Sequence, residues 1–328
     1  MATSAVRRLL VELQHVQNEF ARLYGVTDIF SNSKIFEILI ADHLGLELIP
    51  GHSGSCDAKD ELGRDVEIKH FKESSSNHSW TFNDFSDNTI EKLQSKVASV
   101  VFAHVDDGAS PPIVDWFYRV PGENVGRYLA DATTRIRNMR KMINVSPRQI
   151  ECLMHFERTE DGSDWHPYRD LLAKVFLVIK RLELESDVSN LLTSSKLWEL
   201  VVAIELGHKV NSEQGGRAGA FDAEDLQGNL YEYKVSSTRA WNFQDISDQV
   251  LTKYREREHF VLAVVDKPGL KTTEIHLVEP DRLVPHLKRK LEARKAKLKN
   301  KGLSLRRNQV SLSAGELKLV GANKVFSD

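Results

Sequence analysis

The chain has few cysteines, no long apolar run and almost no net charge. Cys56 and Cys152 are the only cysteines among 328 residues, too few for a disulfide framework or a zinc-ligand set, so a reducing, cytoplasmic compartment is expected. The first residues mix polar and apolar side chains around Glu12, so neither a signal peptide nor a membrane span is predicted. The net charge of −2 is uninformative about nucleic acid, because binding depends on where the basic residues lie. A P-loop motif is absent, so no ATP-binding domain is expected.

What the chain does contain is an internal repeat. Residues of the first half recur in the second half in an order that never breaks. The matched pairs include Arg7 with Arg169, Lys34 with Lys196, Glu37 with Glu199, Gly45 with Gly207, Asp57 with Asp222, Lys69 with Lys234, Trp80 with Trp241, Asp87 with Asp248, and Pro121 with Pro280. One such match can arise by chance, but the series cannot. The sequence therefore predicts two tandem domains, residues 1–160 and 161–328.

Hydrophobic spacing assigns the same elements to each half. It predicts helices at 5–24, 33–45 and 87–98, and again at 168–185, 195–207 and 248–257. Continuous apolar runs predict strands at 97–106 and 113–120, and again at 259–266 and 273–280. The candidate caps are Ser33 and Ser195 for the second helices, Gly45 and Gly207 at their ends, and Asp84 or Asp87 with Asp245 or Asp248 for the third. This order predicts an α/β fold in which each half is a mixed central sheet flanked by helices.

Between these elements lie two similar segments, DAKDELGRDVEIK at 57–69 and DAEDLQGNLYEYK at 222–234. Each has turn-forming sequence around a glycine, Gly63 or Gly228, and therefore reads as a β-hairpin. In an antiparallel hairpin centred there, Asp57 lies opposite Glu67, and Asp222 lies opposite Glu232. Lys69 and Lys234 point to the same face, two residues further along the strand. Facing carboxylates repel, and an oxygen-preferring ion such as Mg²⁺ would remove that cost.

A third carboxylate is available in each half. Glu37 and Glu199 lie in the middle of otherwise apolar helices, where a buried charge is costly unless it is paired or bound to a cation. We therefore expect both to face the hairpins, as further metal ligands. The competing interpretation is a surface hairpin with ordinary ion pairs, and the second copy of the pattern argues against it.

An Asp followed by Glu-x-Lys on a hairpin, behind a helix that carries a Glu, resembles the PD-(D/E)XK nuclease superfamily, which includes many type II restriction endonucleases. The resemblance covers about residues 33–120 and 195–280. It assigns Asp57, Glu67, Asp222 and Glu232 as metal-binding acids, Lys69 and Lys234 as catalytic lysines, and Glu37 and Glu199 as the helix acids that some members use. One departure is that no Pro precedes either Asp; Cys56 and Phe221 stand there.

The resemblance implies a Mg²⁺-dependent endonuclease that acts on double-stranded DNA. The duplication implies that one chain serves as a pseudodimer, with one intact site for each strand. A structure-specific repair nuclease is the alternative within the nucleases, and a non-catalytic DNA-binding module is the alternative outside them. No membrane and no ATP are expected as partners, and further homo-oligomerisation stays open.

Candidate DNA contacts follow the hairpins and lie in late basic segments. They are Lys72, Asn83, Arg239, Asn242, Gln244, Arg148 and Arg306. Amides interleaved with Trp80, Phe82, Trp241 and Phe243 could read base edges, although the aromatics themselves are equally typical of a core. Residues 288–307 hold ten Lys or Arg and one Glu, which favours contact with DNA phosphates over a merely solvated helix face. The first half is milder there, with Arg135, Arg137, Arg140, Lys141 and Arg148.

Overall fold

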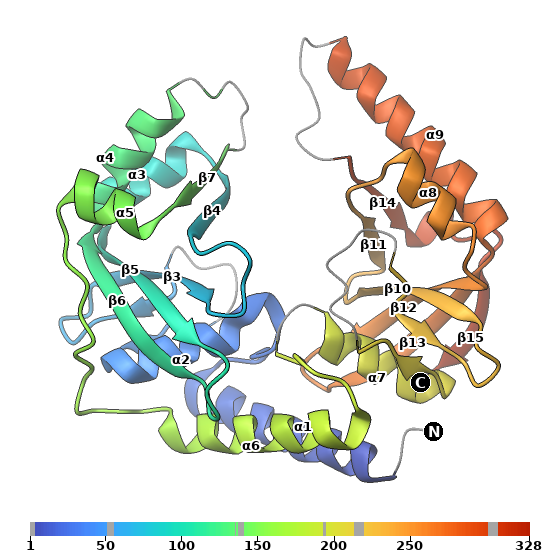
Figure 1. Cartoon of the computed structure of the whole chain (residues 1–328), viewed down its shortest axis with the longest axis horizontal. Coiled ribbons are helices and arrows are strands. Elements are labelled where there is room, and N and C mark those ends of the chain that lie inside the picture. The colour runs from blue at the N-terminus through green and yellow to red at the C-terminus, as the bar shows by residue number, and fades with distance from the viewer. Residues whose placement is uncertain are drawn as a thin grey trace. The chain divides into compact units, whose positions relative to one another are not determined.

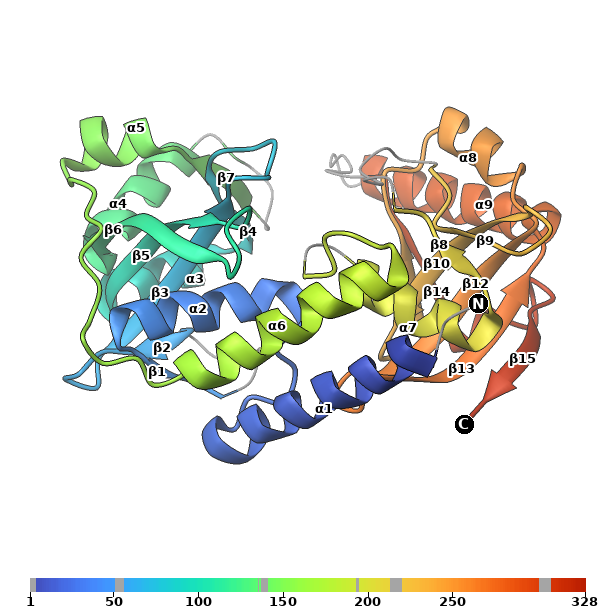
Figure 2. The ribbon, with the colours of Figure 1, turned by 60° about the horizontal axis from the view of Figure 1, so that its bottom comes forward.

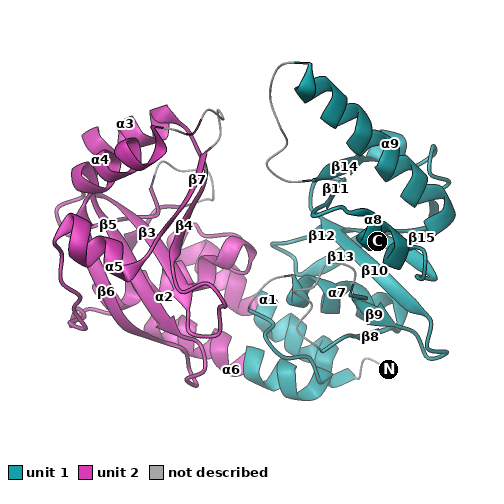
Figure 3. Ribbon diagram, turned by 45° about the horizontal axis from the view of Figure 1, so that its top comes forward, with its two compact units in different colours: residues 1–14, 179–328 teal, residues 15–178 magenta. Residues whose placement is uncertain are grey.

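The computed structural model describes residues 4–50, 56–134, 136, 141–192, 195–212, 220–300 and 308–328. The chain forms two compact units (Figure 3). One comprises residues 15–178, and the other comprises residues 1–14 with 179–328. Two long helices, α1 (Ser4–Tyr24) and α6 (Arg169–Ser186), contribute residues to both units. Within the described residues, no helix has the length and apolarity needed to span a membrane.

The unit of residues 15–178 is built on a mixed sheet of order β1-β2-β3-β5-β6 (Figure 1). Its strands are β1 (Glu47–Leu48), β2 (Ala58–Lys59), β3 (Asp65–Lys72), β5 (Val97–Asp106) and β6 (Ile113–Pro121). The strands β3 and β5 are parallel, and the other neighbours are antiparallel. A second, two-stranded sheet pairs β4 (Trp80–Phe85) with β7 (Lys141–Val145).

Helices cover both faces of this sheet. The helix α2 (Lys34–Leu44) contacts β3 and β6, while α3 (Asp87–Ser95) and α4 (Gly122–Thr133) pack together and contact β5 (Figure 2). Val100 and Phe102 belong to the core under α3 and α4. Val101 and Ala103 alternate with them and are also fully buried, because side chains of a strand point to opposite faces. Short helical segments complete the unit: η1 (Ser31–Ser33), α5 (Pro147–Gln149) and the π-helix η2 (Ile150–Met154).

The second unit repeats this arrangement. Its sheet has the order β15-β13-β12-β10-β9-β8, with β10 and β12 parallel. The strands are β8 (Lys209–Val210), β9 (Ala223–Glu224), β10 (Leu230–Ser236), β12 (His259–Asp266), β13 (Lys271–Val278) and β15 (Asn323–Ser327). A two-stranded sheet pairs β11 (Ala240–Phe243) with β14 (Val310–Ser313). The helices are α7 (Lys196–Leu206), α8 (Asp248–Tyr254), α9 (Pro280–Lys299) and the short η3 (Ala314–Glu316).

The likeness of the two units extends to single hydrogen bonds. The buried indole of Trp80 donates from Nε1 to the Ala103 carbonyl at 2.8 Å. The buried indole of Trp241 donates to the Ala263 carbonyl at 2.9 Å. Both bonds tie the two-stranded sheet of a unit to the strand that follows the crossover helix. The predicted mixed α/β fold is confirmed, and an origin of the likeness by duplication remains our proposal.

The helix caps differ in part from the predictions. Gly45 and Gly207 end α2 and α7 with φ of 61° and 70°, as expected for left-handed C-caps. Ser33 and Ser195 occupy the N-cap positions, but neither side chain caps its helix. The prediction that Asp residues cap α3 and α8 is wrong, because Ser86 and Ser247 precede these helices as N-caps. The Ser247 hydroxyl accepts from the Val250 N–H at 3.2 Å, since an aspartate one residue later lies inside the helix.

The two compact units and the two sequence repeats divide the chain at different places. The change of unit falls within α6, whereas the repeat predicts a boundary near residue 160. The helix α6 matches α1 in the repeat, yet its first turns belong to the unit of residues 15–178. The division into residues 1–160 and 161–328 therefore remains a proposal about the repeat, not about folding units.

Candidate active sites

Two hairpins place the motif residues, and both have the register that the sequence predicts. In the first, Ala58 pairs with Val66 and Lys59 with Asp65, which sets Asp57 opposite Glu67. The turn is held by Asp60, whose Oδ1 accepts the N–H groups of Leu62 and Arg64 at 3.0 and 2.9 Å. Gly63 supplies the positive φ of 72° that this turn requires.

The second hairpin is built in the same way. Ala223 pairs with Tyr231 and Glu224 with Leu230, which sets Asp222 opposite Glu232. Asp225 Oδ1 accepts the N–H groups of Gln227 and Asn229 at 2.8 and 2.9 Å, and Gly228 has φ of 82°. Asp60 and Asp225 are therefore matched turn residues, a role that the repeat alone did not reveal.

In the first site the lysine contacts the acid directly. Lys69 Nζ donates to Glu67 Oε1, and it lies 3.3 Å from the Ile68 carbonyl oxygen. Asp57 Oδ2 accepts the Ile68 N–H at 2.7 Å, which fixes this carboxylate beside the strand. The ammonium also lies over the Phe82 ring, 5.6 Å from its centroid. The Lys69 ammonium is thus hydrogen-bonded to one acid, Glu67, feels the charge of Asp57, and lies over an aromatic ring.

The second site has the same contacts. Lys234 Nζ donates to Glu232 Oε1 at 2.6 Å and to the Tyr233 carbonyl at 3.0 Å. Asp222 Oδ2 accepts the Tyr233 N–H at 2.8 Å. Phe243 corresponds to Phe82 of the first site, and its ring centroid lies 5.9 Å from Lys234 Nζ. The two candidate sites therefore agree residue by residue.

The helix acids have partners that the sequence analysis overlooked. Lys34 Nζ lies 2.8 Å from Glu37 Oε2, and Lys196 Nζ lies 2.9 Å from Glu199 Oε2. Both lysines are buried. The available signal was the lysine three residues before each glutamate, a spacing that puts both side chains on one helix face. These cations offset the burial of the acids, so ligation of a metal by Glu37 and Glu199 stays a prediction.

The charges at each site influence one another. Burial, and after it the charge of Asp57, raises the pKa of Glu37. Burial and Asp57 also raise the pKa of Glu67, against the lowering effect of Lys69. In the second site, burial and then Glu232 raise the pKa of Asp222 to about 8. Burial alone would lower the pKa of Lys69 and Lys234, but the surrounding acids outweigh it and raise both. Both lysines therefore remain protonated at neutral pH.

The donor set suits an oxygen-preferring cation, although the expected three-carboxylate group is not assembled. Among the described residues, no three His, Cys, Asp or Glu side chains are grouped closely enough to hold a metal. Glu232 Oε2 is nevertheless buried without a hydrogen bond of good geometry, although the Tyr254 hydroxyl lies near this carboxylate. A buried carboxylate oxygen left unsatisfied is costly, and a cation would remove that cost. Asp222, Glu232 and the Tyr233 carbonyl offer the hard oxygen ligands that Mg²⁺ prefers, and Asp57, Glu67 and Ile68 match them.

The predicted DNA-contacting residues have varied surroundings. Lys72 lies over the Phe36 ring at 5.5 Å, and burial lowers its pKa. Arg239 donates to Glu274 at 2.7 Å, and the Asn242 side-chain oxygen accepts from the Ser311 hydroxyl. Asn83, Gln244 and Arg148 are exposed. Arg306, like Arg135, Arg137 and Arg140, lies outside the described residues. The neighbouring Trp80 and Trp241 are fully buried, which supports their structural interpretation.

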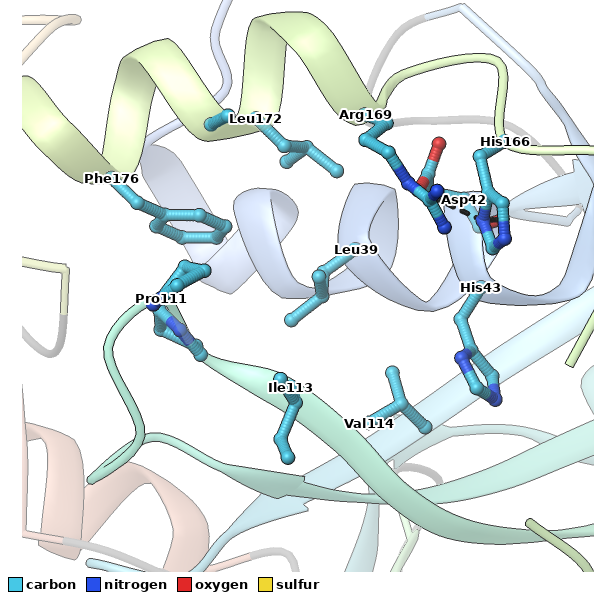
Figure 4. A pocket seen from close by; sticks show the side chains of 12 residues that line it. Leu39, Asp42, His43, Pro111, Ile113, Val114, His166, Arg169, Leu172 and Phe176 are labelled. Carbon is cyan, nitrogen blue, oxygen red and sulfur yellow. Dashed lines mark hydrogen bonds and ion pairs between the residues drawn. The ribbon is translucent and has the colours of Figure 1, made fainter.

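A separate cavity of about 420 Å³ lies in the unit of residues 15–178, between α2, α6 and the start of β6 (Figure 4). Leu39, Leu172 and Phe176 form its apolar wall. At its other end His166 Nδ1 lies 3.3 Å from Asp42 Oδ2. No residue of either hairpin lines this cavity, so it is not part of the candidate active sites.

Comparison with known proteins agrees with the first half of this description. No curated protein shows significant similarity to the chain. Residues 1–149 match the family model described as restriction endonuclease PvuII. The match includes α2, the first hairpin and the sheet that carries Asp57, Glu67 and Lys69. Residues 1–149 are therefore similar to this restriction endonuclease family, and the similarity supports a type II restriction endonuclease-like PD-(D/E)XK fold for the first half of the chain.

Proposed function

We propose that the chain is a Mg²⁺-dependent type II restriction endonuclease that hydrolyses phosphodiester bonds of double-stranded DNA. One observation carries the proposal. The Asp, Glu and Lys of the half that matches the restriction endonuclease family recur in the other half with the same register and the same contacts. A degenerate site would be expected to have lost its lysine or one acid, and neither half has.

The site residues divide the chemistry between them. Bound Mg²⁺ would supply an activated water and neutralise charge that develops on the phosphate. Asp57 and Glu67, or Asp222 and Glu232, would hold the ion. Lys69 and Lys234 are protonated, because the neighbouring acids raise the pKa of each. Beside bound Mg²⁺ they would position or help to deprotonate the attacking water, or stabilise the charge that develops on phosphorus.

The single chain supplies both sites of a pseudodimer. Ordinary restriction enzymes with two-fold symmetry use two identical chains, and each chain cuts one strand. Here the two halves differ in sequence, so the recognised DNA need not be palindromic. We propose that each half cleaves one strand of the same duplex.

Single substitutions separate the two sites. Lys69→Met and Lys234→Met should each convert supercoiled plasmid to the nicked circle and leave the linear product undetected, because one site stays intact. Sequencing of the nicks should place them on opposite strands, and the double variant should not cut. Lys59→Met is the matched control: this hairpin lysine pairs with Asp65 at 3.2 Å, outside the site, and should leave linear product. Complete loss of cleavage in either single variant, or no effect in both, would contradict two independent sites.

The substrate class is tested with a long natural DNA. Discrete fragments with Mg²⁺, and none with a chelator, are expected of a restriction enzyme. Selective cutting of flaps, branches or mismatches would instead indicate a repair nuclease. Binding without cleavage of any substrate would indicate a non-catalytic DNA-binding module.

A further inference from the structure

The helix α9 continues well beyond the core that supports it. Its buried residues are Pro280, Leu283, Val284, Leu287 and Leu291. None of residues 292–299 is buried, and we call this segment the α9 tip. At a rise of 1.5 Å per residue, the tip is about 12 Å long. A helix stabilised only by its packed face would be expected to end nearer its last core contact.

The α9 tip is strongly basic. It contains Arg294, Lys295, Lys297 and Lys299 and a single acid, Glu292, so its net charge is 4 − 1 = +3. Among the described residues, no ion pair or hydrogen bond joins the three lysine side chains to a partner. Lys295 and Lys299 are four residues apart on one helix face, where like charges repel. A polyanion along the tip would remove this repulsion.

The base of the tip is fixed to the unit that holds the second site. Lys290 Nζ lies 2.6 Å from both Glu316 Oε1 and the Ser311 carbonyl oxygen. Arg294 donates to the Gln309 carbonyl at 2.8 Å. Ser311 belongs to β14, and β14 pairs with β11, the strand that carries Phe243 beneath Lys234. The tip is therefore tied through two strands to the second candidate site.

In the part of the first half that the structure describes, no counterpart of this tip is seen. The matching helix of the first half is α4, which begins after Pro121 as α9 begins after Glu279. The helix α4 ends at Thr133, and this last residue is itself buried. Its charged residues are Glu123, Arg127 and Asp131, and Arg127 pairs with Glu123 at 2.6 Å. Within the described residues, the basic helical extension is thus seen on α9 and not on α4.

We propose that the α9 tip is a phosphate-binding arm that grips the backbone of duplex DNA beside the segment contacted by the two matched cores. The proposal rests on the proposed DNA endonuclease function. Phosphates are the ligands that an exposed, unpaired set of lysines binds without regard to base sequence. The arm extends the unit that holds the second site, so it lengthens the contacted DNA on the side of that site.

Binding in a chelator-containing buffer tests the arm without cleavage. The logarithm of the association constant for a duplex is measured against the logarithm of salt concentration. The triple variant Lys295→Gln, Lys297→Gln, Lys299→Gln should reduce the magnitude of this slope by up to about 2.7, since each released phosphate contact contributes about 0.9. The matched control removes three exposed lysines of the same unit, Lys209, Lys318 and Lys324, by the same change and should leave the slope near the original value.

The outcomes separate the arm from the enzyme. An unchanged slope in the arm variant, or equal reductions in both variants, would overturn the arm. Failure of the unsubstituted protein to bind any duplex would instead overturn the DNA-directed function itself. Hydroxyl-radical footprinting on intact DNA that contains a sequence cleaved by the protein gives a second readout. The protected region should reach further on one side of the cleavage position, and it should be shorter on that side in the arm variant. A footprint that is symmetric from the outset would also contradict the arm.

Discussion

At the level of single residues, Glu37 and Glu199 each lie beside a cation, as expected, but the cation found there is a lysine. A glutamate in an apolar helix needs a cation, and the sequence pattern indicated a metal ion for that role. The structure supplies Lys34 and Lys196 instead, one helical turn before each acid. In the second unit both partners are almost fully buried, with 10% and 8% of their side chains exposed. Glu199 is therefore a structural ion-pair partner, and its ligation of a metal stays a prediction.

The variant Lys196→Met tests whether the buried Glu199 depends on the charge of this lysine. Removing the lysine leaves the Glu199 charge buried and unpaired, which is expected to lower the free energy of unfolding by roughly 3–5 kcal/mol. The double variant Lys196→Met, Glu199→Leu should recover most of that loss, because both charges are replaced by apolar groups. Urea denaturation of the full-length protein measures both. Equal losses in the two variants would mean that the lysine acts through packing of its stem and not through its charge.

Among the secondary-structure elements, the two hairpins set the geometry of the candidate sites through a few turn residues. An aspartate that accepts two turn N–H groups and a glycine with positive φ fix the centre of each hairpin. That centre fixes the register, and the register sets acid opposite acid. A slip by one residue would turn Glu232 and Lys234 to the other face of the sheet. The turn residues thus position the candidate site although they do not touch it.

Gly228→Ala tests the turn. A Cβ at Gly228 meets no atom within 4 Å, so the expected cost comes only from its φ of 82° and is about 1–2 kcal/mol of unfolding free energy. Gly315→Ala is the matched control, since a Cβ there also meets nothing and its φ is not positive. Its stability should change by about 0.5 kcal/mol or less. Thermal or urea unfolding compares the two, and similar losses at both positions would rule out backbone strain at Gly228.

At the scale of the whole molecule, the unit that folds and the unit that repeats do not coincide. Tyr168 lies beyond the repeat boundary near residue 160, yet it completes the core of the unit of residues 15–178. Its hydroxyl accepts the Leu48 N–H at 2.8 Å and donates to the Leu46 carbonyl at 3.1 Å. Its own N–H donates to Asp42 at 2.6 Å. A fragment cut at the repeat boundary would lose all three bonds and the packing of α6.

Two fragments test this difference. A fragment of residues 1–178 should unfold cooperatively, whereas a fragment of residues 1–160 should be less stable by several kcal/mol, because truncating a buried aromatic alone costs roughly 3–5 kcal/mol. Urea titrations followed by tryptophan fluorescence compare them. Equal midpoints would show that α6 is dispensable for this unit, and a full-length Tyr168→Phe variant would then isolate the hydroxyl.

The sequence was enough to predict the main helices, the central strands, the repeated pattern and the hairpin register, but not the strands β4, β7, β11 and β15. These follow from local rules: apolar periodicity, glycine at left-handed positions, and the constant pairing sum of an antiparallel turn. They were enough to place Asp57, Glu67 and Lys69 on one face, and their partners in the second half likewise. The helix ends were less exact, because serine and aspartate compete for the same cap position.

The surroundings of these residues became visible in the folded chain. The tertiary structure paired Glu37 and Glu199 with lysines, left Glu232 Oε2 unsatisfied, and raised the pKa of Asp222 to about 8. The last buried residue of α9 is Leu291, and the helix continues from there to Lys299. In α4 the last helical residue, Thr133, is itself buried. The lysine of each helix pair could have been found from its local spacing, three residues before its acid. Burial and unsatisfied oxygens, in contrast, depend on contacts between segments far apart in the chain, and no local pattern of residues specifies them.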